Sequence, residues 1–164
     1  MAVALNVLGM GATQAQASAA ALDGEAHLIR NAGNNLCLQP RSGDVFAPIV
    51  QLDCTGSAEQ RWFIQDLGSR RYQFANLATH QCFDAFDGAF NGARLLQNQC
   101  APISNDQFLS SRVLPASVNL RSRVGFKDTN FCIDVPQSTT ERNVAMQLFQ
   151  CNGTGAQQWI VGFG

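Results

Sequence analysis

The chain has 164 residues, which is enough for one domain with a single core and too few for two. Its 11 Lys and Arg against 12 Asp and Glu leave a net charge of −1, so nucleic acid and anionic membrane surfaces are poor ligands for it. With 46% hydrophobic and 14% charged residues the chain should fold. Its 14 Gly and 11 Phe favour turns and strands, which predicts a mostly β protein.

The first 21 residues read as a probable signal peptide or leader remnant. Residues 2–12 are apolar and too few to span a bilayer, and 15–17 and 17–19 both fit an A-x-A cleavage pattern. No Lys or Arg precedes the apolar run, and a disordered Ala-rich tail is the alternative. The leader predicts a secreted protein, extracellular or periplasmic, with its domain at 22–164. No other apolar run has the length of a transmembrane helix.

The six cysteines form three couples with separations of 17, 18 and 19 residues. They are Cys37 with Cys54, Cys82 with Cys100, and Cys132 with Cys151. The first members lie 45 and 50 residues apart and the second members 46 and 51, which indicates a threefold repeat. In an exported chain the economical pairing of the 15 possible is one bridge within each repeat. Buried free thiols are the alternative, and His27 and His80 are too few to complete a zinc site.

Other residues recur in register with the cysteines. Eight residues before each first Cys stands an apolar residue, and eight after each second Cys a large aromatic: Ile29, Phe74 and Val124; Trp62, Phe108 and Trp159. Short apolar runs separated by Gly, Asn, Asp and Ser turns give about four strands in each repeat. The repeats cover about 26–66, 70–112 and 118–161. Because one unit cannot bury its apolar face alone, the three should pack around a pseudo-threefold axis.

At this point the sequence resembles a family. Gln60-Arg61-Trp62 and Gln157-Gln158-Trp159 are similar to the Q-x-W signature of the ricin B-chain type β-trefoil lectins, also called family 13 carbohydrate-binding modules. The third repeat matches that pattern best. The resemblance implies an all-β fold, a twelve-stranded β-trefoil of three four-stranded repeats with one disulfide in each, and the Q-x-W tryptophans in its core.

The resemblance also implies where sugars bind. The family uses an Asp two residues after the first Cys, an aromatic two before the second Cys and an Asn near the Q-x-W. These types suit a sugar, because carboxylates and amides bond hydroxyls and a ring covers the apolar C–H face. The candidate carbohydrate-binding residues are Asp134, Phe149 and Gln157 in the third repeat, and Asp84, Asn98 and Asn105 in the second.

No repeat carries the full set of sugar-binding residues. The third has Ala156 where the Asn would stand, and the second has Asn98 in place of the aromatic and Asp106 in place of the Gln. The first, with Gln39 and Leu52, should be silent. We expect Asp84 and Asp134 to face the solvent.

Catalysis is not indicated. The sequence has no G-x-S-x-G motif, and Asp84 and Asp134 belong to different repeats, so a glycosidase pair is unexpected. We predict a protein that is no enzyme and needs no cofactor or metal.

The sequence therefore predicts a secreted lectin that recognises glycans or glycoproteins, with galactose-like sugars suspected, in the second and third repeats. The alternative is a cell-binding or structural subunit of a secreted bacterial toxin complex, with protein partners and degraded sugar sites. A trefoil protease inhibitor is a third class, but nothing marks a reactive loop.

Overall fold

The computed structural model describes residues 21–102 and 104–162. The predicted leader lies outside the described residues except for Ala21. In the part of the chain that is described, no helix is long and apolar enough to cross a membrane.

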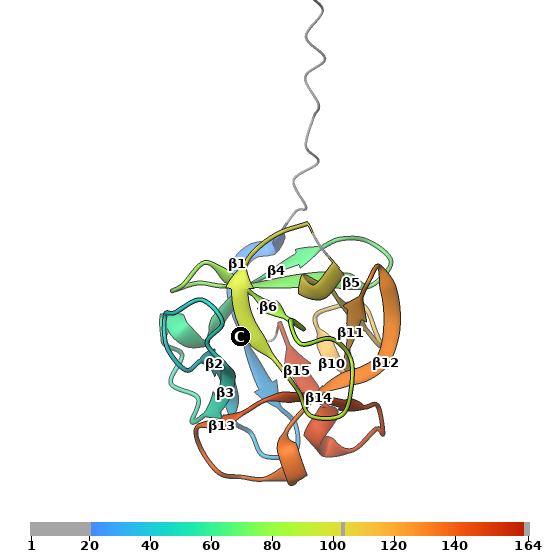
Figure 1. The fold of residues 1–164 in the computed structure, drawn as a ribbon. Coiled ribbons are helices and arrows are strands. Elements are labelled where there is room, and N and C mark those ends of the chain that lie inside the picture. Colours follow the sequence, from blue (N-terminus) through green and yellow to red (C-terminus); the bar gives the residue numbers. More distant parts are fainter. Residues whose placement is uncertain (1–20, 103, 163–164) are drawn as a thin grey trace, which may run out of the picture.

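The described residues form 15 strands and four short 3-10 helices, here grouped by repeat (Figure 1). The first repeat holds β1 (Ala21–Asn31), β2 (Cys37–Pro40), β3 (Ile49–Leu52), η1 (Ala58–Gln60) and β4 (Arg61–Asp66). The second holds β5 (Arg71–Asn76), β6 (Gln81–Asp84), β7 (Ala93–Arg94), β8 (Leu96–Gln99), η2 (Ser104–Asp106) and β9 (Phe108–Ser110). The third holds β10 (Ala116–Val118), β11 (Leu120–Val124), β12 (Lys127–Asp134), η3 (Pro136–Ser138), β13 (Val144–Ala145), β14 (Gln147–Gln150), η4 (Gly155–Gln157) and β15 (Trp159–Val161).

These strands reduce to the expected twelve-stranded trefoil. Only Asn119 separates β10 from β11, and the two together correspond to the single strand β1. In the third repeat, β10 pairs with β15 of the same repeat and β11 pairs with β9 of the preceding repeat. In the first repeat, β1 alone pairs with β4 of the same repeat and with β15. The two-residue strands β7 and β13 pair with β14 and β3, so they tie the second hairpin to the third repeat and the third hairpin to the first. The predicted all-β trefoil is confirmed.

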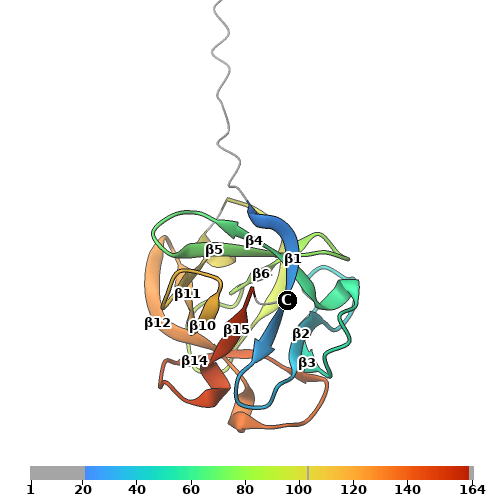
Figure 2. The same ribbon diagram turned by 180° about the vertical axis from the view of Figure 1, so that it is seen from behind.

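Six strand positions form a barrel, and three hairpins extend from it. The barrel consists of β1, β4, β5, β9, the β10–β11 pair and β15, and it closes where β1 and β15 lie side by side (Figure 2). The hairpins are β2–β3, β6–β8 and β12–β14. In each, the first Cys faces the residue two before the second Cys: Cys37 faces Leu52, Cys82 faces Asn98 and Cys132 faces Phe149.

The aromatic residue eight positions after each second Cys lies in the core. Trp62, Phe108 and Trp159 are fully buried. Because a buried indole N–H needs an acceptor, each tryptophan donates to a hairpin carbonyl at 3.0 Å, Trp62 to Leu38 and Trp159 to Ile133. The Q-x-W tryptophans thus join the barrel to the hairpins and are core residues, as predicted.

The predicted disulfide pairing is confirmed. Bridges join Cys37 to Cys54, Cys82 to Cys100 and Cys132 to Cys151. Each closes the hairpin of its own repeat. The three bridges therefore fix the loops that carry the candidate sites.

A polar residue at the end of the first barrel strand holds neighbouring repeats together. Asn31 is buried, and its amide donates to the carbonyls of Gly155, Ala156 and Gln158 at 3.1–3.3 Å. Asn76 plays the same part for the second repeat by donating to the Glu59 and Arg61 carbonyls. At the third position the same register has Ser122, which bonds Thr129 instead.

Candidate functional site

The third-repeat hairpin forms a shallow pocket of about 390 Å³. Because β12 and β14 run antiparallel, Asp134 faces Gln147 at the end of the hairpin where the connecting loop begins, and Phe149 faces Cys132 two residues further along. The pocket is lined by Asp134, Val135, Pro136, Gln137, Ser138, Gln147, Phe149, Asn152 and Thr154. The structure therefore brings the predicted carboxylate and the predicted aromatic together in one cavity.

Two amides hold Asp134 at the base of this pocket. Its Oδ1 accepts from Gln147 Nε2 at 2.8 Å and its Oδ2 from Gln157 Nε2 at 3.1 Å. The expectation that Asp134 faces the solvent is wrong: it is only 5% exposed, because these amides replace its water. Burial raises the pKa of Asp134, and the bonds from Gln147 and Gln157 oppose that rise. Each oxygen accepts one hydrogen bond from the described residues, which leaves lone pairs for a sugar hydroxyl.

Gln157 lies beneath the carboxylate rather than in the pocket lining. It is fully buried, donates to Asp134 and to the Gln150 carbonyl, and accepts the Asn152 backbone N–H at 2.8 Å. Its position makes it a residue that orients Asp134. Ala156, at the position of the family's Asn, is buried with the core.

Asn152 offers the amide that the third repeat lacks at position 156. Its Oδ1 accepts from the backbone N–H and the hydroxyl of Thr154, and among the described residues its Nδ2 has no acceptor. Asn152 also lines the pocket beside Phe149, whose ring is 36% exposed. Sequence reasoning missed Asn152 and Gln147. The antiparallel register could have found Gln147, since it stands two residues before Phe149 just as Asp134 stands two after Cys132.

The second repeat has a different arrangement around its carboxylate. Asp84 is only 1% exposed, so the expectation that it faces the solvent is wrong here too. Asn98 fills the aromatic position and donates to Asp84 Oδ2 at 2.8 Å. The backbone carbonyl of Asn105 accepts from Ala85 N–H at 3.0 Å. In the second repeat the side chain at the platform position therefore bonds the carboxylate and offers no ring to a sugar.

Asp106 adds a second buried carboxyl where the other repeats have Gln. Its Oδ2 accepts the Ala101 backbone N–H at 2.8 Å, and its Oδ1 and that of Asp84 have no N–H donor among the described residues. The two carboxyls interact with each other. Burial raises both pKa values, that of Asp106 to about 7, with the Asp84 charge adding to the rise.

The first repeat keeps the scaffold without a carboxylate. Gln39 takes the place of Asp134 and accepts from Gln60 Nε2 at 3.0 Å. Leu52 stands at the aromatic position. The pocket beside Gln39 thus presents an amide and no ring from the platform position.

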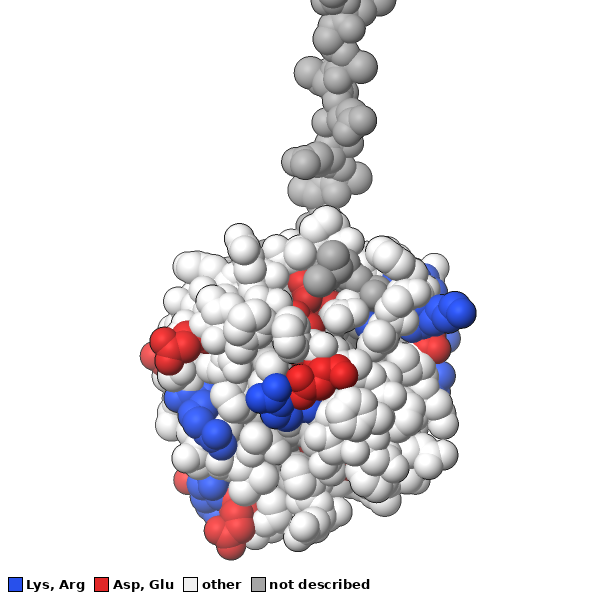
Figure 3. All heavy atoms as spheres, viewed as in Figure 1, with Lys and Arg blue, Asp and Glu red and all other residues white. Residues whose placement is uncertain are grey.

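The face of the molecule in Figure 3 is mostly uncharged, with few and scattered Lys, Arg, Asp and Glu. Asp84 and Asp134 end strands of different hairpins, β6 and β12. Within residues 21–102 and 104–162, no group of three His, Cys, Asp or Glu side chains is arranged to hold a metal ion. The third-repeat pocket can accept hydroxyl hydrogens, donate an amide N–H and cover an apolar face.

Solved structures share this fold. A designed threefold-symmetric protein, ThreeFoil, superposes with a TM-score of 0.74 at 19% identity, over 82% of this chain and 95% of its own. The Macrolepiota procera ricin B-like lectin, solved with lactose, gives 0.68 at 16% identity, over 83% and 93%. A mosquitocidal holotoxin gives 0.71 at 15% identity, over 82% of this chain and 16% of its own.

The sequence itself matches a family over residues 14–109, more than half of the chain. The match spans the first two repeats and ends before the third, which sequence reasoning placed closest to the family pattern. None of the curated proteins compared with the sequence matches it. Lectin domains of this type are typically non-catalytic, and the fold supports carbohydrate binding in general. The chain belongs to the ricin-type β-trefoil lectin domain-like family.

Proposed function

We propose that this protein is a secreted lectin that binds a galactose-like sugar in the third-repeat pocket. The observation that carries the proposal is the position of Asp134, whose two oxygens are each held by one glutamine amide at the base of a cavity that Phe149 borders. A fixed carboxylate can accept two directed hydroxyl bonds, and the ring can cover the C–H face of the sugar. The lectin solved with lactose, a galactose-containing sugar, has the same fold.

The test is a calorimetric titration of galactose and lactose into the intact, oxidised protein and its Phe149→Ala variant. Phe149 is part-exposed, so its loss should leave the fold intact and weaken binding about tenfold. Phe126→Ala is the matched control, because that ring is 67% exposed and lies outside the pocket. Equal affinities of Phe149→Ala and the unaltered protein would remove the third repeat from sugar binding.

Asp134 needs a conservative change because its carboxylate also satisfies two buried amides. Asp134→Asn keeps the shape and removes the charge, and we expect a tenfold to hundredfold loss of affinity with only a small loss of stability. Thermal melting of the variant separates the two effects. A large fall in melting temperature with unchanged affinity would make Asp134 a structural residue.

A second function is favoured by the first and second repeats, where Asp84 is buried and Gln39 replaces the carboxylate. A cell-binding or structural subunit of a secreted toxin complex can retain the trefoil with degraded sugar sites. The similarity to one part of a holotoxin supports this alternative. Purifying the protein from its source under mild conditions distinguishes a lectin from a toxin subunit. A toxin subunit should copurify with a second chain, and a lectin that acts alone should not.

A further inference from the structure

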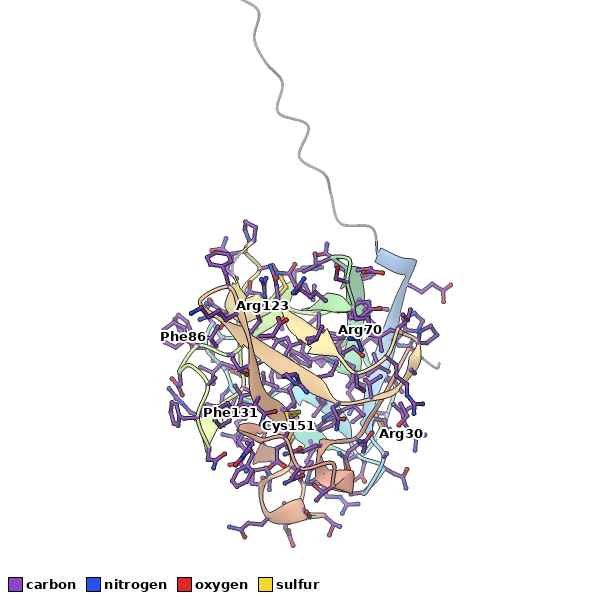
Figure 4. All side chains as sticks on the ribbon, turned by 90° about the vertical axis from the view of Figure 1, so that its right-hand side faces the viewer. Arg30, Arg70, Phe86, Arg123, Phe131 and Cys151 are labelled. Carbon is purple, nitrogen blue, oxygen red and sulfur yellow. A yellow bond between two sulfur atoms is a disulfide. The ribbon has the colours of Figure 1, made fainter. Side chains whose placement is uncertain are left out.

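A cavity of about 290 Å³ lies between the second and third repeats, and it differs from the pocket at Asp134. Its walls include Arg70 before β5, Ser111 after β9, Asn119, Arg121 on β11 and the Cys132–Cys151 disulfide. Figure 4 looks onto this side of the molecule, where it labels Arg70 and Cys151. No Asp or Glu lines this cavity.

Within the described residues, neither arginine of the cavity forms an ion pair. Arg70 donates to the Ser111 carbonyl at 2.7 Å, which leaves its charge without a counterion. Arg121 is half-buried, and within the described residues its guanidinium makes neither a hydrogen bond nor an ion pair. Arg70 is exposed and none of the Arg121 side-chain nitrogens is fully buried, so a ligand can reach both guanidinium groups from the solvent.

The adjacent ion pairs do not neutralise this cavity. Asp128 pairs with both Arg71 and Arg123, each at 3.2 Å, so its one carboxylate already serves two guanidinium groups. Arg71 directly follows Arg70, and Arg123 lies two residues after Arg121 on the same strand. These four arginines and one aspartate therefore carry an excess of positive charge in a chain whose net charge is −1.

The excess of positive charge is found at the junction of the second and third repeats and is not a general feature of the fold. Arg121 faces Cys132, and the residues that face the first Cys in the other repeats are Arg30 and Ala75. A guanidinium N–H of Arg30 donates a hydrogen bond to Asn35 Oδ1. A related cavity of the second repeat is lined by Gln65, Leu67, Gln73, Cys100, Ala101, Pro102 and Gln107, none of which is charged.

Two serine hydroxyls of the cavity can also donate, whereas the Asn119 amide already donates to the Gln157 carbonyl. The Ser111 hydroxyl accepts the Asn119 backbone N–H at 3.0 Å, and Ser110, another wall residue, accepts that of Arg112 at 3.4 Å. Since each oxygen already accepts a bond, each O–H remains able to donate. Two guanidinium groups and two hydroxyls surround a space that is small for a ligand site. Arginine binds sulfate and carboxylate through paired N–H bonds.

We propose that this cavity binds the sulfate or carboxylate group of an acidic saccharide. The anion would lie between Arg70 and Arg121, with the serine hydroxyls as further donors. The saccharide part rests on the proposed lectin function, whereas the anion part rests on the cavity alone.

The test is a titration of the oxidised protein with galactose 6-sulfate, galacturonate, galactose and inorganic sulfate at low ionic strength. We expect both acidic sugars to bind to this cavity, and Arg121→Gln to weaken their binding about tenfold to a hundredfold. Arg30→Gln is the matched control, since Arg30 holds the equivalent position in the first repeat and lies outside the cavity. Raising the salt concentration should weaken binding of the acidic sugars and of sulfate and leave galactose binding unchanged.

Unchanged affinity of Arg121→Gln for both acidic sugars, with an unchanged melting temperature, overturns the anion site. Inorganic sulfate that binds as tightly as the sulfated sugar overturns the saccharide part. If Arg121→Gln is impaired in folding, Arg70→Gln repeats the test from the other wall of the cavity. Phe149→Ala, titrated with galactose in parallel, reports separately on the lectin proposal, so the failure of either proposal is visible without the other.

Discussion

A single residue, Asp106, changes the chemistry of the second repeat. At the same position Gln60 and Gln157 each use Oε1 to accept a backbone N–H and Nε2 to donate to the residue two positions after the first Cys, which is Gln39 or Asp134. Asp106 can accept the Ala101 N–H, but an ionised Asp106 has no hydrogen to give Asp84. The pair avoids two buried negative charges only by retaining a proton.

This pair predicts that the free energy of unfolding falls as the pH rises from about 4 to about 7. The pKa of Asp106 rises from 3.8 to about 7 on folding, so the folded protein binds the extra proton. Its contribution to the free energy of unfolding is present in full below about pH 4 and is lost as the pH rises through about 7. The raised pKa values of Asp84 and Asp134 act in the same direction. Chemical unfolding at several pH values measures the slope.

Asp106→Gln should make the free energy of unfolding less dependent on pH. The new Nε2 can donate to Asp84 as Gln157 donates to Asp134, which should stabilise the protein by about 1–3 kcal/mol at pH 8 and by less at pH 5. Asp44→Asn, an exposed change, is the control. A slope in Asp106→Gln as steep as in the unaltered protein would mean that other groups set the pH dependence.

Elements of different repeats are joined by buried side-chain amides as well as by strand pairing. Asn76 is fully buried; its Nδ2 serves two carbonyls and its Oδ1 accepts the N–H groups of Ala78 and Thr79. A side chain that satisfies four backbone groups fixes the strand β5 to the turn that follows it and to η1. The joint depends on tertiary contact, because Glu59 and Ala78 belong to different repeats.

Asn76→Ala should therefore cost about 2–4 kcal/mol of stability, since the backbone groups it serves lose their partner within the fold. Denaturant unfolding gives the value. Asn130→Ala, at an exposed position, should stay within about 0.5 kcal/mol of the unaltered protein. A similar small effect of Asn76→Ala would show that water replaces the amide and that the joint adds little.

The whole molecule is one core shared by three repeats. Trp62, Phe83, Phe74 and Phe108 contact one another through their rings, with centroids 4.2–6.3 Å apart. Trp159 joins the same buried cluster from the third repeat. Because no repeat has a core of its own, damage to one repeat should unfold all three together.

Trp159→Ala should cost about 3–5 kcal/mol, a large part of a total stability of roughly 5–15 kcal/mol. Trp159→Phe copies the second repeat and should cost about 1–3 kcal/mol, mainly by leaving the Ile133 carbonyl without its donor. Melting curves with a single transition are expected for both variants. Two separated transitions, or an unchanged melt in Trp159→Ala with lost sugar binding, would contradict a shared core.

Local spacing was enough to predict much of this protein. The couples Cys37–Cys54, Cys82–Cys100 and Cys132–Cys151 set the repeat, and the aromatic eight residues after each second Cys marked the core. The resemblance to the lectin family predicted that Asp134 and Phe149 meet in one pocket, and the antiparallel pairing that starts from Cys132 brings them there.

The burial of the polar residues was decided by the tertiary structure alone. Asp84 and Asp134 look like turn residues in the sequence, yet both are buried, because amides distant in the chain, those of Asn98, Gln147 and Gln157, approach to replace their water. Arg70 and Arg121 line one cavity although about fifty residues separate them. The sequence by itself determined the repeat, its disulfides and its core, since these follow a regular spacing along the chain. Which charges meet, and which are left without a partner, depends on how the three repeats close around one axis, and no local pattern encodes that.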